Sequence, residues 1–202
     1  MVKELNKKKF EKLGINVIYF IIEENLNNMS FMFNECSSLK EINFVNIETI
    51  QVTKMKVIFQ LCTELERLDL SNFNTSNVTD MGWMFNECHK LKEIKGINNF
   101  ITINATNMEG MFADCNELVN LDLSNFNTYR VAVMGSMFYE CYKLKEIKGI
   151  YNFRINFRIT DMISSFEMFD ECNDLEYIDI SKFNSDSRLI SKIINRKLIK
   201  GN

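Results

Sequence analysis

The 202-residue sequence contains no proline, one histidine, one tryptophan and seven glycines. With so few glycines, the sequence has no Gly-rich loop of the kind that cradles phosphates. The single histidine, His89, has neither a paired Cys nucleophile motif nor a G-x-S-x-G motif to work with. No two cysteines show the C-x-x-C spacing that is typical of zinc sites. We therefore expect no catalytic residue, no metal ligand and no cofactor, and interpret the protein as a non-enzyme.

Long apolar runs and a strong net charge are also missing. No apolar segment approaches the roughly 18 residues of a membrane span, so we expect no integral membrane segment. A net charge of −3 gives no electrostatic field that would recruit nucleic acid. Lysines at 7–9 precede an apolar stretch at 15–22, but Glu23 and Glu24 follow where a signal peptide would have small residues. We interpret residues 1–28 as an N-terminal cap and keep export as the alternative.

What the sequence does have is a repeat that runs through most of the chain. Six cysteines recur at intervals of 26, 26, 27, 26 and 31 residues, with Phe three positions before and Leu three positions after each one. The cysteine register consists of Cys36, Cys62, Cys88, Cys115, Cys141 and Cys172. The phenylalanine register consists of Phe33, Phe59, Phe85, Phe112, Phe138 and Phe169. Such self-similarity is typical of a repeat architecture.

The hydrophobic period changes within each unit. Apolar residues in 81–88 lie at i, i+3, i+4 and i+7, which predicts a short helix. The apolar residues of 65–70 predict a short strand with alternate side chains inward, and the Ser- and Asn-rich 71–77 predicts a turn. Because one unit cannot bury its own apolar face, neighbouring units must stack. The expected fold class is an α/β repeat solenoid of about six coils, each with one short parallel strand and one short helix.

A second repeat lies over the first. Residues 68–75 and 121–128 share the phrase L-D-L-S-N-F-N-T, whereas 94–100 and 147–153 share I-K-G-I-x-N-F. The array is therefore expected to be built from a duplicated pair of units.

The phrases L-D-L-S-N-F-N-T-S-N-V-T-D-M and M-F-x-x-C-x-x-L resemble the BspA-like leucine-rich repeat family, in its roughly 26-residue bacterial surface-protein variety. The resemblance covers about residues 29–184. It implies a leucine-rich-repeat-like fold and a surface or secreted protein that acts in adhesion or ligand binding. Phe73 and Phe126 replace the Asn that such repeats carry, so we expect Phe to fill the core in place of an Asn ladder.

The six cysteines allow two interpretations. Neighbouring coils about 4.8 Å apart would bring stacked cysteines within disulfide reach. The equal place of Cys in every unit, among Met, Phe and Leu, favours instead a ladder of buried thiols.

The residues that follow the second strand aliphatic are expected to point away from the core and to line up across the coils. The row reads Asn43, Asp69, Lys95, Asp122, Lys148 and Asp179. A ladder of cross-strand ion pairs, each contributing about 0.2–1 kcal/mol, is the favoured interpretation. The alternative is a mixed-charge groove for a protein or glycan partner, with the charged members of the row as the candidate binding residues.

Residues 188–200 alternate aliphatic and basic residues, which predicts a basic amphipathic helix. A cap over the last coil is favoured within 185–202, because the open end of a solenoid exposes apolar surface. A helix that binds a membrane surface or a partner is the alternative.

Taken together, these features predict a single continuous domain that works as a non-enzymatic binding module. Adhesion or ligand binding at the cell surface follows from the family resemblance. An intracellular protein-interaction scaffold is the alternative, since the thiols and the unclear export signal favour it. A thiol-dependent enzyme is the least favoured interpretation, because no activated-Cys environment is visible.

Overall fold

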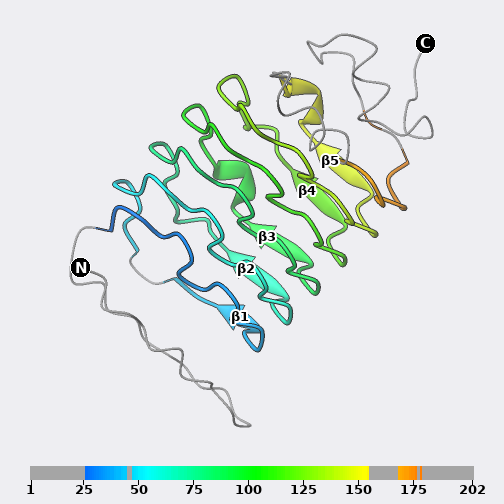
Figure 1. Ribbon diagram of the computed structural model, residues 1–202, viewed down its shortest axis with the longest axis horizontal. Coiled ribbons are helices and arrows are strands. Elements are labelled where there is room, and N and C mark those ends of the chain that lie inside the picture. Colours follow the sequence, from blue (N-terminus) through cyan, green and yellow to red (C-terminus); the bar gives the residue numbers. More distant parts are fainter. Residues whose placement is uncertain (1–25, 45–46, 155–167, 177, 179–202) are drawn as a thin grey trace.

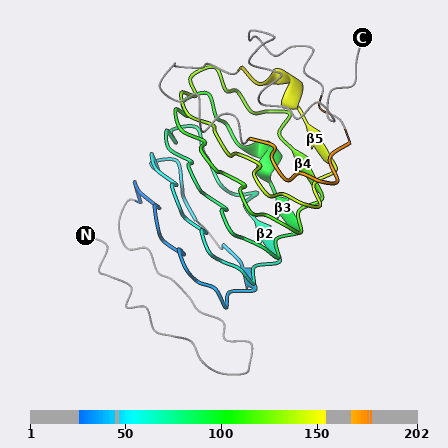
Figure 2. The same cartoon turned by 45° about the vertical axis from the view of Figure 1, so that its right-hand side comes forward.

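The computed structural model describes residues 26–44, 47–154, 168–176 and 178. Within these ranges the chain forms coils that stack side by side, with the strands in chain order along one side of the stack (Figure 1; Figure 2). Each coil is numbered here by its cysteine, from coil 1 with Cys36 to coil 6 with Cys172. Nearly all of the expected N-terminal cap, the whole expected helix in 185–202 and Asp179 lie outside the described residues.

Each of coils 1 to 5 contributes one short strand. The strands are β1 (Glu41–Ile42), β2 (Arg67–Asp69), β3 (Glu93–Lys95), β4 (Asn120–Asp122) and β5 (Glu146–Lys148). All their pairings are parallel, in a sheet β1-β2-β3 and a sheet β4-β5. From β2 to β5 the central aliphatic residue is buried between more exposed neighbours, because strand residues alternate between faces. The prediction of one short parallel strand per coil is confirmed for these coils.

The segment expected to be a helix in each coil is a run of turns. In the described part of the chain the helical elements are two 3-10 helices, η1 (Ile97–Asn99) and η2 (Ile150–Asn152), and no α-helix occurs. The helix expected over 81–88 does not form. A short 3-10 turn follows the strand in coils 3 and 5 instead.

Hydrogen bonding between coils explains why this segment is not helical. In 81–88 alternate amides donate to carbonyls of the next coil, as Phe85 N does to Met111 O at 2.9 Å, so these amides cannot bond within an α-helix. Trp83 and Glu87 also have positive φ angles, 56° and 58°, which a right-handed helix excludes. The side chains assigned to the inner face of the helix are nevertheless buried: Met81, Met84, Phe85 and Cys88.

The core is built around a column of phenylalanine rings. Neighbouring rings of the phenylalanine register lie 5.4 to 5.9 Å apart, centroid to centroid, in stacked orientation. A second column contains Phe100, Phe126 and Phe153, with centroids 6.4 and 6.5 Å apart. Phe73 and Phe126 are buried, as the sequence predicts. Stacked aromatic pairs add to the free energy gained by burial, so the columns tie each coil to the next.

All six cysteines lie in the described ranges and none forms a disulfide. In coils 2 to 6 the Cys Sγ donates to the carbonyl of the register Phe in the preceding coil, at 3.0 to 3.3 Å. The expected ladder of buried thiols is confirmed for these five coils, whereas Cys36 is exposed.

The two glycine-containing phrases explain the longer repeat. Gly96 has φ of +82°, and a Cβ there would lie 2.5 Å from Ser71 Cα in the preceding coil. Gly149 has the same φ, and its Cβ would lie 2.4 Å from Ser124 Cα. Only glycine permits both the positive φ and the close approach. The I-K-G-I phrase of coils 3 and 5 therefore packs on the L-D-L-S phrase of coils 2 and 4.

Candidate functional site

The candidate row on the strand face begins with an ion pair between coils 2 and 3. Asp69 and Lys95 are register partners on β2 and β3, and Lys95 Nζ lies 2.7 Å from Asp69 Oδ2. The hydrogen bond from Lys95, followed by bonds from Ser71, lowers the pKa of Asp69. The same contact raises the pKa of Lys95. Both side chains stay exposed, as expected for a cross-strand ion pair.

The second pair of the row behaves differently. Asp122 and Lys148 are register partners on β4 and β5, but no ion pair joins them within the described residues. Asp122 Oδ1 accepts hydrogen bonds from Ser124 N and Ser124 Oγ at 3.1 and 2.6 Å. These bonds, and then the charge of Lys148, lower the pKa of Asp122. Since β3 and β4 belong to different sheets, the structure brings the row together as two pairs.

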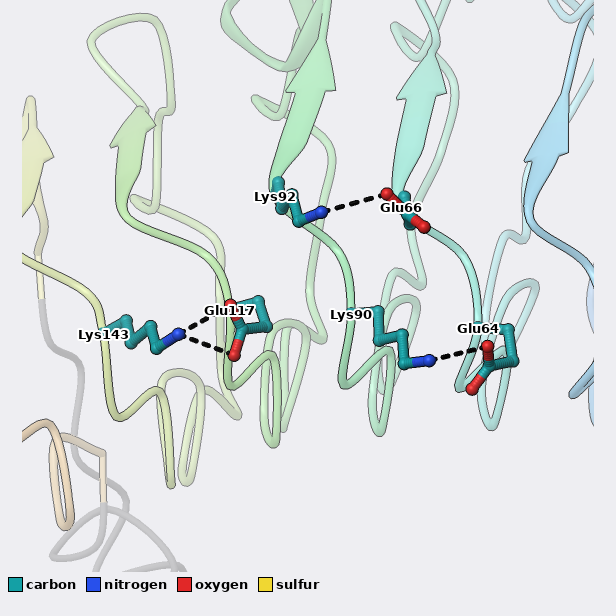
Figure 3. A network of polar contacts seen from close by, with 6 residues as sticks. All are labelled: Glu64, Glu66, Lys90, Lys92, Glu117 and Lys143. Atoms are coloured by element: carbon teal, nitrogen blue, oxygen red, sulfur yellow. Dashed lines mark hydrogen bonds and ion pairs between the residues drawn. The ribbon is translucent and has the colours of Figure 1, made fainter.

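A second set of exposed ion pairs lies on the turns that lead into the strands (Figure 3). Lys90 pairs with Glu64 and Lys92 with Glu66 between coils 3 and 2, at 2.7 and 2.9 Å. Lys143 pairs with Glu117 between coils 5 and 4, at 2.7 Å. These pairs were not predicted from the sequence, although the charge two positions after the cysteine alternates in sign from coil 2 to coil 5: Glu64, Lys90, Glu117 and Lys143. Exposed pairs contribute about 0–1 kcal/mol each, so this surface is charged but self-neutralised.

Carboxylates also line up at the position before the cysteine. The column consists of Glu35, Glu87, Asp114, Glu140 and Glu171. Desolvation, followed by the charge of Glu140 and a hydrogen bond with it, raises the pKa of Asp114 to about 6. No group of three or more His, Cys, Asp or Glu side chains in the described ranges is arranged to hold a metal ion.

A ladder of buried threonines fixes the turn on the other side of the strands. Its members are Thr49, Thr75, Thr102 and Thr128. Each Oγ1 donates to the carbonyl of one residue in the next coil and accepts the amide of the same residue, as Thr128 does with Arg154 O and N at 3.1 and 2.7 Å. For Thr49, Thr75 and Thr102 this partner directly precedes the next threonine of the ladder. The recurrence every 26 or 27 residues is the signal that could have found this ladder.

An open hollow of about 510 Å³ lies next to this ladder, across coils 3 to 5. The Tyr129 side chain is 59% exposed, and Arg154 Cζ lies 5.2 Å from the centre of its ring. The lining residues are Ile103, Ser124, Asn125, Phe126, Asn127, Tyr129, Asn152 and Arg154. The hollow was not predicted from the sequence, because its residues meet only when the coils are stacked.

The thiols are unsuited to nucleophilic chemistry in coils 2 to 6. Burial raises the pKa of Cys62 and Cys172 to about 12, and raises it well above the ordinary value for the three thiols between them. A thiol that stays protonated is a poor nucleophile. His89 is half-buried, and its carbonyl accepts the amide of Glu117.

The sequence matches one known family model. A family described as "Mycoplasma protein of unknown function, DUF285" matches residues 27–150 and 66–177, which together span well over half of the sequence. The chain belongs to this family. Among solved structures, this DUF285 chain is similar to the T. pallidum leucine rich repeat protein TpLRR, at 18% identity and a TM-score of 0.45 over 86% of this chain and 79% of that one. No curated protein matches the sequence.

The chain is thus a member of this family whose described coils stack through parallel strands. The family model identifies the family of the chain and names no ligand. In the part of the chain that the structure describes, no helix has the length and apolarity needed to cross a membrane.

Proposed function

We propose that this protein is a non-enzymatic binding module that presents successive coils of its solenoid to a partner outside the cell, as an adhesion or ligand-binding protein. The observation that supports the proposal most is that each coil buries one set of side chains in the core and exposes another set at equivalent positions. Five of the six thiols and most large apolar side chains are buried in the core, whereas equivalent turn and strand positions are exposed on coil after coil. Stacked repeats create extended surfaces of this kind, and such surfaces are used for binding.

The charge pattern narrows the class of partner. Four ion pairs join exposed acids and bases of neighbouring coils among coils 2 to 5, and the whole sequence has a net charge of only −3. A surface with matched charges gives no strong field to a polyanion, so the proposal is a protein or glycan and not a nucleic acid. The strand-face row of Asp69, Lys95, Asp122 and Lys148, with Asp179 beyond the described residues, remains a proposed part of that surface.

An intracellular protein-interaction scaffold is the second candidate. Five buried cysteines recur in register on neighbouring coils, where disulfides would be within reach, yet all five are free thiols. Disulfides persist mainly in oxidising compartments, so an array of buried thiols is also compatible with a reducing one.

Protease treatment of intact source cells, followed by immunodetection of the array, tests the proposal. Loss of the signal while a cytoplasmic marker protein is preserved is the expected result. Full protection of the array under conditions that remove a known surface protein would contradict the surface proposal and favour the scaffold.

A further inference from the structure

We infer that the hollow around Tyr129 and Arg154 is a docking site for an extended peptide segment that carries a carboxylate beside an apolar side chain. This inference rests on the proposed binding function and names a site and a partner chemistry for it. The hollow lies on the turns that follow the strands of coils 3 to 5, and it adjoins the strand-face row at Ser124, whose Oγ donates to Asp122. Its residues therefore belong to a different surface from the ion pairs of Figure 3.

Arg154 supplies the charge that would recognise a carboxylate. The Oγ1 of Thr128 donates to the carbonyl of Arg154 and accepts its amide. The guanidinium of Arg154 lies over the Tyr129 ring. Within the described residues, no acidic side chain forms an ion pair with Arg154. The 5.2 Å separation of Cζ from the ring centre is that of a cation–π contact, and the planar N–H donors of a guanidinium can bind a carboxylate through two parallel hydrogen bonds.

Apolar side chains lie on the same row of turns as this cation, and Tyr129 and Ile103 line the hollow with it. Tyr129, Ile101 and Ile103 are exposed large hydrophobic side chains on adjacent coils. Burial of such side chains by a partner is favourable because it removes apolar surface from water. Tyr and Arg are also the residue types most enriched where protein partners gain most binding free energy. A peptide with an aliphatic or aromatic side chain next to its Asp or Glu matches both features.

The polar lining favours a peptide over a sugar. Asn125 Nδ2 already donates to Asn98 O at 2.7 Å, and Ser124 Oγ donates to Asp122. Asn127 Oδ1 accepts the amide of Tyr129 at 3.0 Å. A ligand rich in hydroxyl groups needs many available donors and acceptors, whereas these groups are partly committed to the turns. The arrangement suits a ligand that makes one strong charged contact and places an apolar side chain against Tyr129 and Ile103.

Selection of displayed random 12-residue peptides on the folded protein provides the test. We expect the enriched peptides to carry Asp or Glu next to an apolar residue. Synthetic copies should bind at least tenfold more weakly to the Arg154→Gln and Tyr129→Ala variants. Replacing the Asp or Glu of the peptide by its amide should weaken binding by a similar factor. Arg67→Gln, an exposed cation on β2, and Ile50→Ala, at the register position of Tyr129 in coil 1, are the matched controls and should leave binding unchanged.

The outcomes separate this site from the proposed function. Enriched peptides that bind both hollow variants as well as they bind the unaltered protein would overturn the site but leave a binding module in place. Absence of any enriched peptide, or enrichment without acidic residues, would overturn the inference, while the protease experiment on cells still judges the function independently. NMR spectra provide one further comparison. If glucuronate shifts the amide resonances of the hollow and the peptides do not, the peptide inference is overturned and an acidic sugar is the ligand.

Discussion

At the scale of single residues, the carboxylate column before the cysteines shows how stacking changes chemistry. Each of these side chains would be an ordinary exposed acid in one isolated unit. Stacking places Asp114 close to Glu140 and partly removes it from water, so its pKa rises to about 6. The folded protein therefore binds this proton more tightly than the unfolded chain, whose Asp pKa is about 3.9. The resulting stability is complete below about pH 3.9 and is lost as the pH rises through about 6.

Asp114→Asn should consequently raise the thermal unfolding midpoint at pH 7, because the amide keeps the shape and cannot ionise. Asn also tolerates the positive φ of 60° at this position. The gain should shrink between pH 6 and pH 4, where the aspartate itself becomes protonated. Thermal unfolding followed by circular dichroism at several pH values measures this, with Glu109→Gln, outside the column, as the control. Equal midpoints for the variant and the unaltered protein at pH 7 would refute the explanation.

At the scale of elements, the contact between the glycine phrase and the serine phrase defines the pairing of coils. Gly96→Ala should lower the free energy of unfolding by at least about 1–2 kcal/mol from the positive φ alone, with further loss from the approach to Ser71. Gly82→Ala is the matched control, since its φ is not positive and the added Cβ meets the end of the Asn107 side chain. Urea unfolding midpoints compare the two variants. A larger loss for Gly82→Ala would contradict this account of the pair.

How far the sequence predicts these elements depends on which interactions decide them. The strands and the buried registers follow from apolar spacing, because a period that recurs in every unit reports which side chains face inward. The segment 81–88 has the spacing of a helix face, but its amides bond to the next coil, and positive φ at Trp83 breaks any helix. Spacing alone cannot distinguish these cases, since both bury the same side chains.

The candidate site was predictable only in part, for a related reason. The pair of Asp69 and Lys95 was visible in the sequence because strand register aligns the two residues directly. Tyr129 and Arg154 occupy different positions of their respective coils and meet through a turn. Alignment on the threonine ladder would have placed them together, but its threonines are less distinctive than a cysteine or phenylalanine register.

At the scale of the whole molecule, charge and sheet pairing divide the array in the same way. The four ion pairs between described residues join coil 2 to coil 3 or coil 4 to coil 5. The two sheets also separate between coils 3 and 4, while turn hydrogen bonds and the Phe85–Phe112 contact cross that junction. The ion pairs therefore form within a unit of two coils, whereas the apolar core continues from one unit to the next.

This division predicts which charges are coupled. Double-mutant cycles with glutamine replacements should give a small favourable coupling between Lys90 and Glu64, as is usual for an exposed ion pair. Lys90 and Glu117 occupy the same register on coils 3 and 4 without forming an ion pair, and their coupling should be near zero. The first coupling should also decrease in high salt, because exposed charges are screened. Equal coupling of Lys90 to both glutamates would instead indicate one continuous row of interacting charges along the solenoid. That result would contradict the division of the ion pairs into two-coil units.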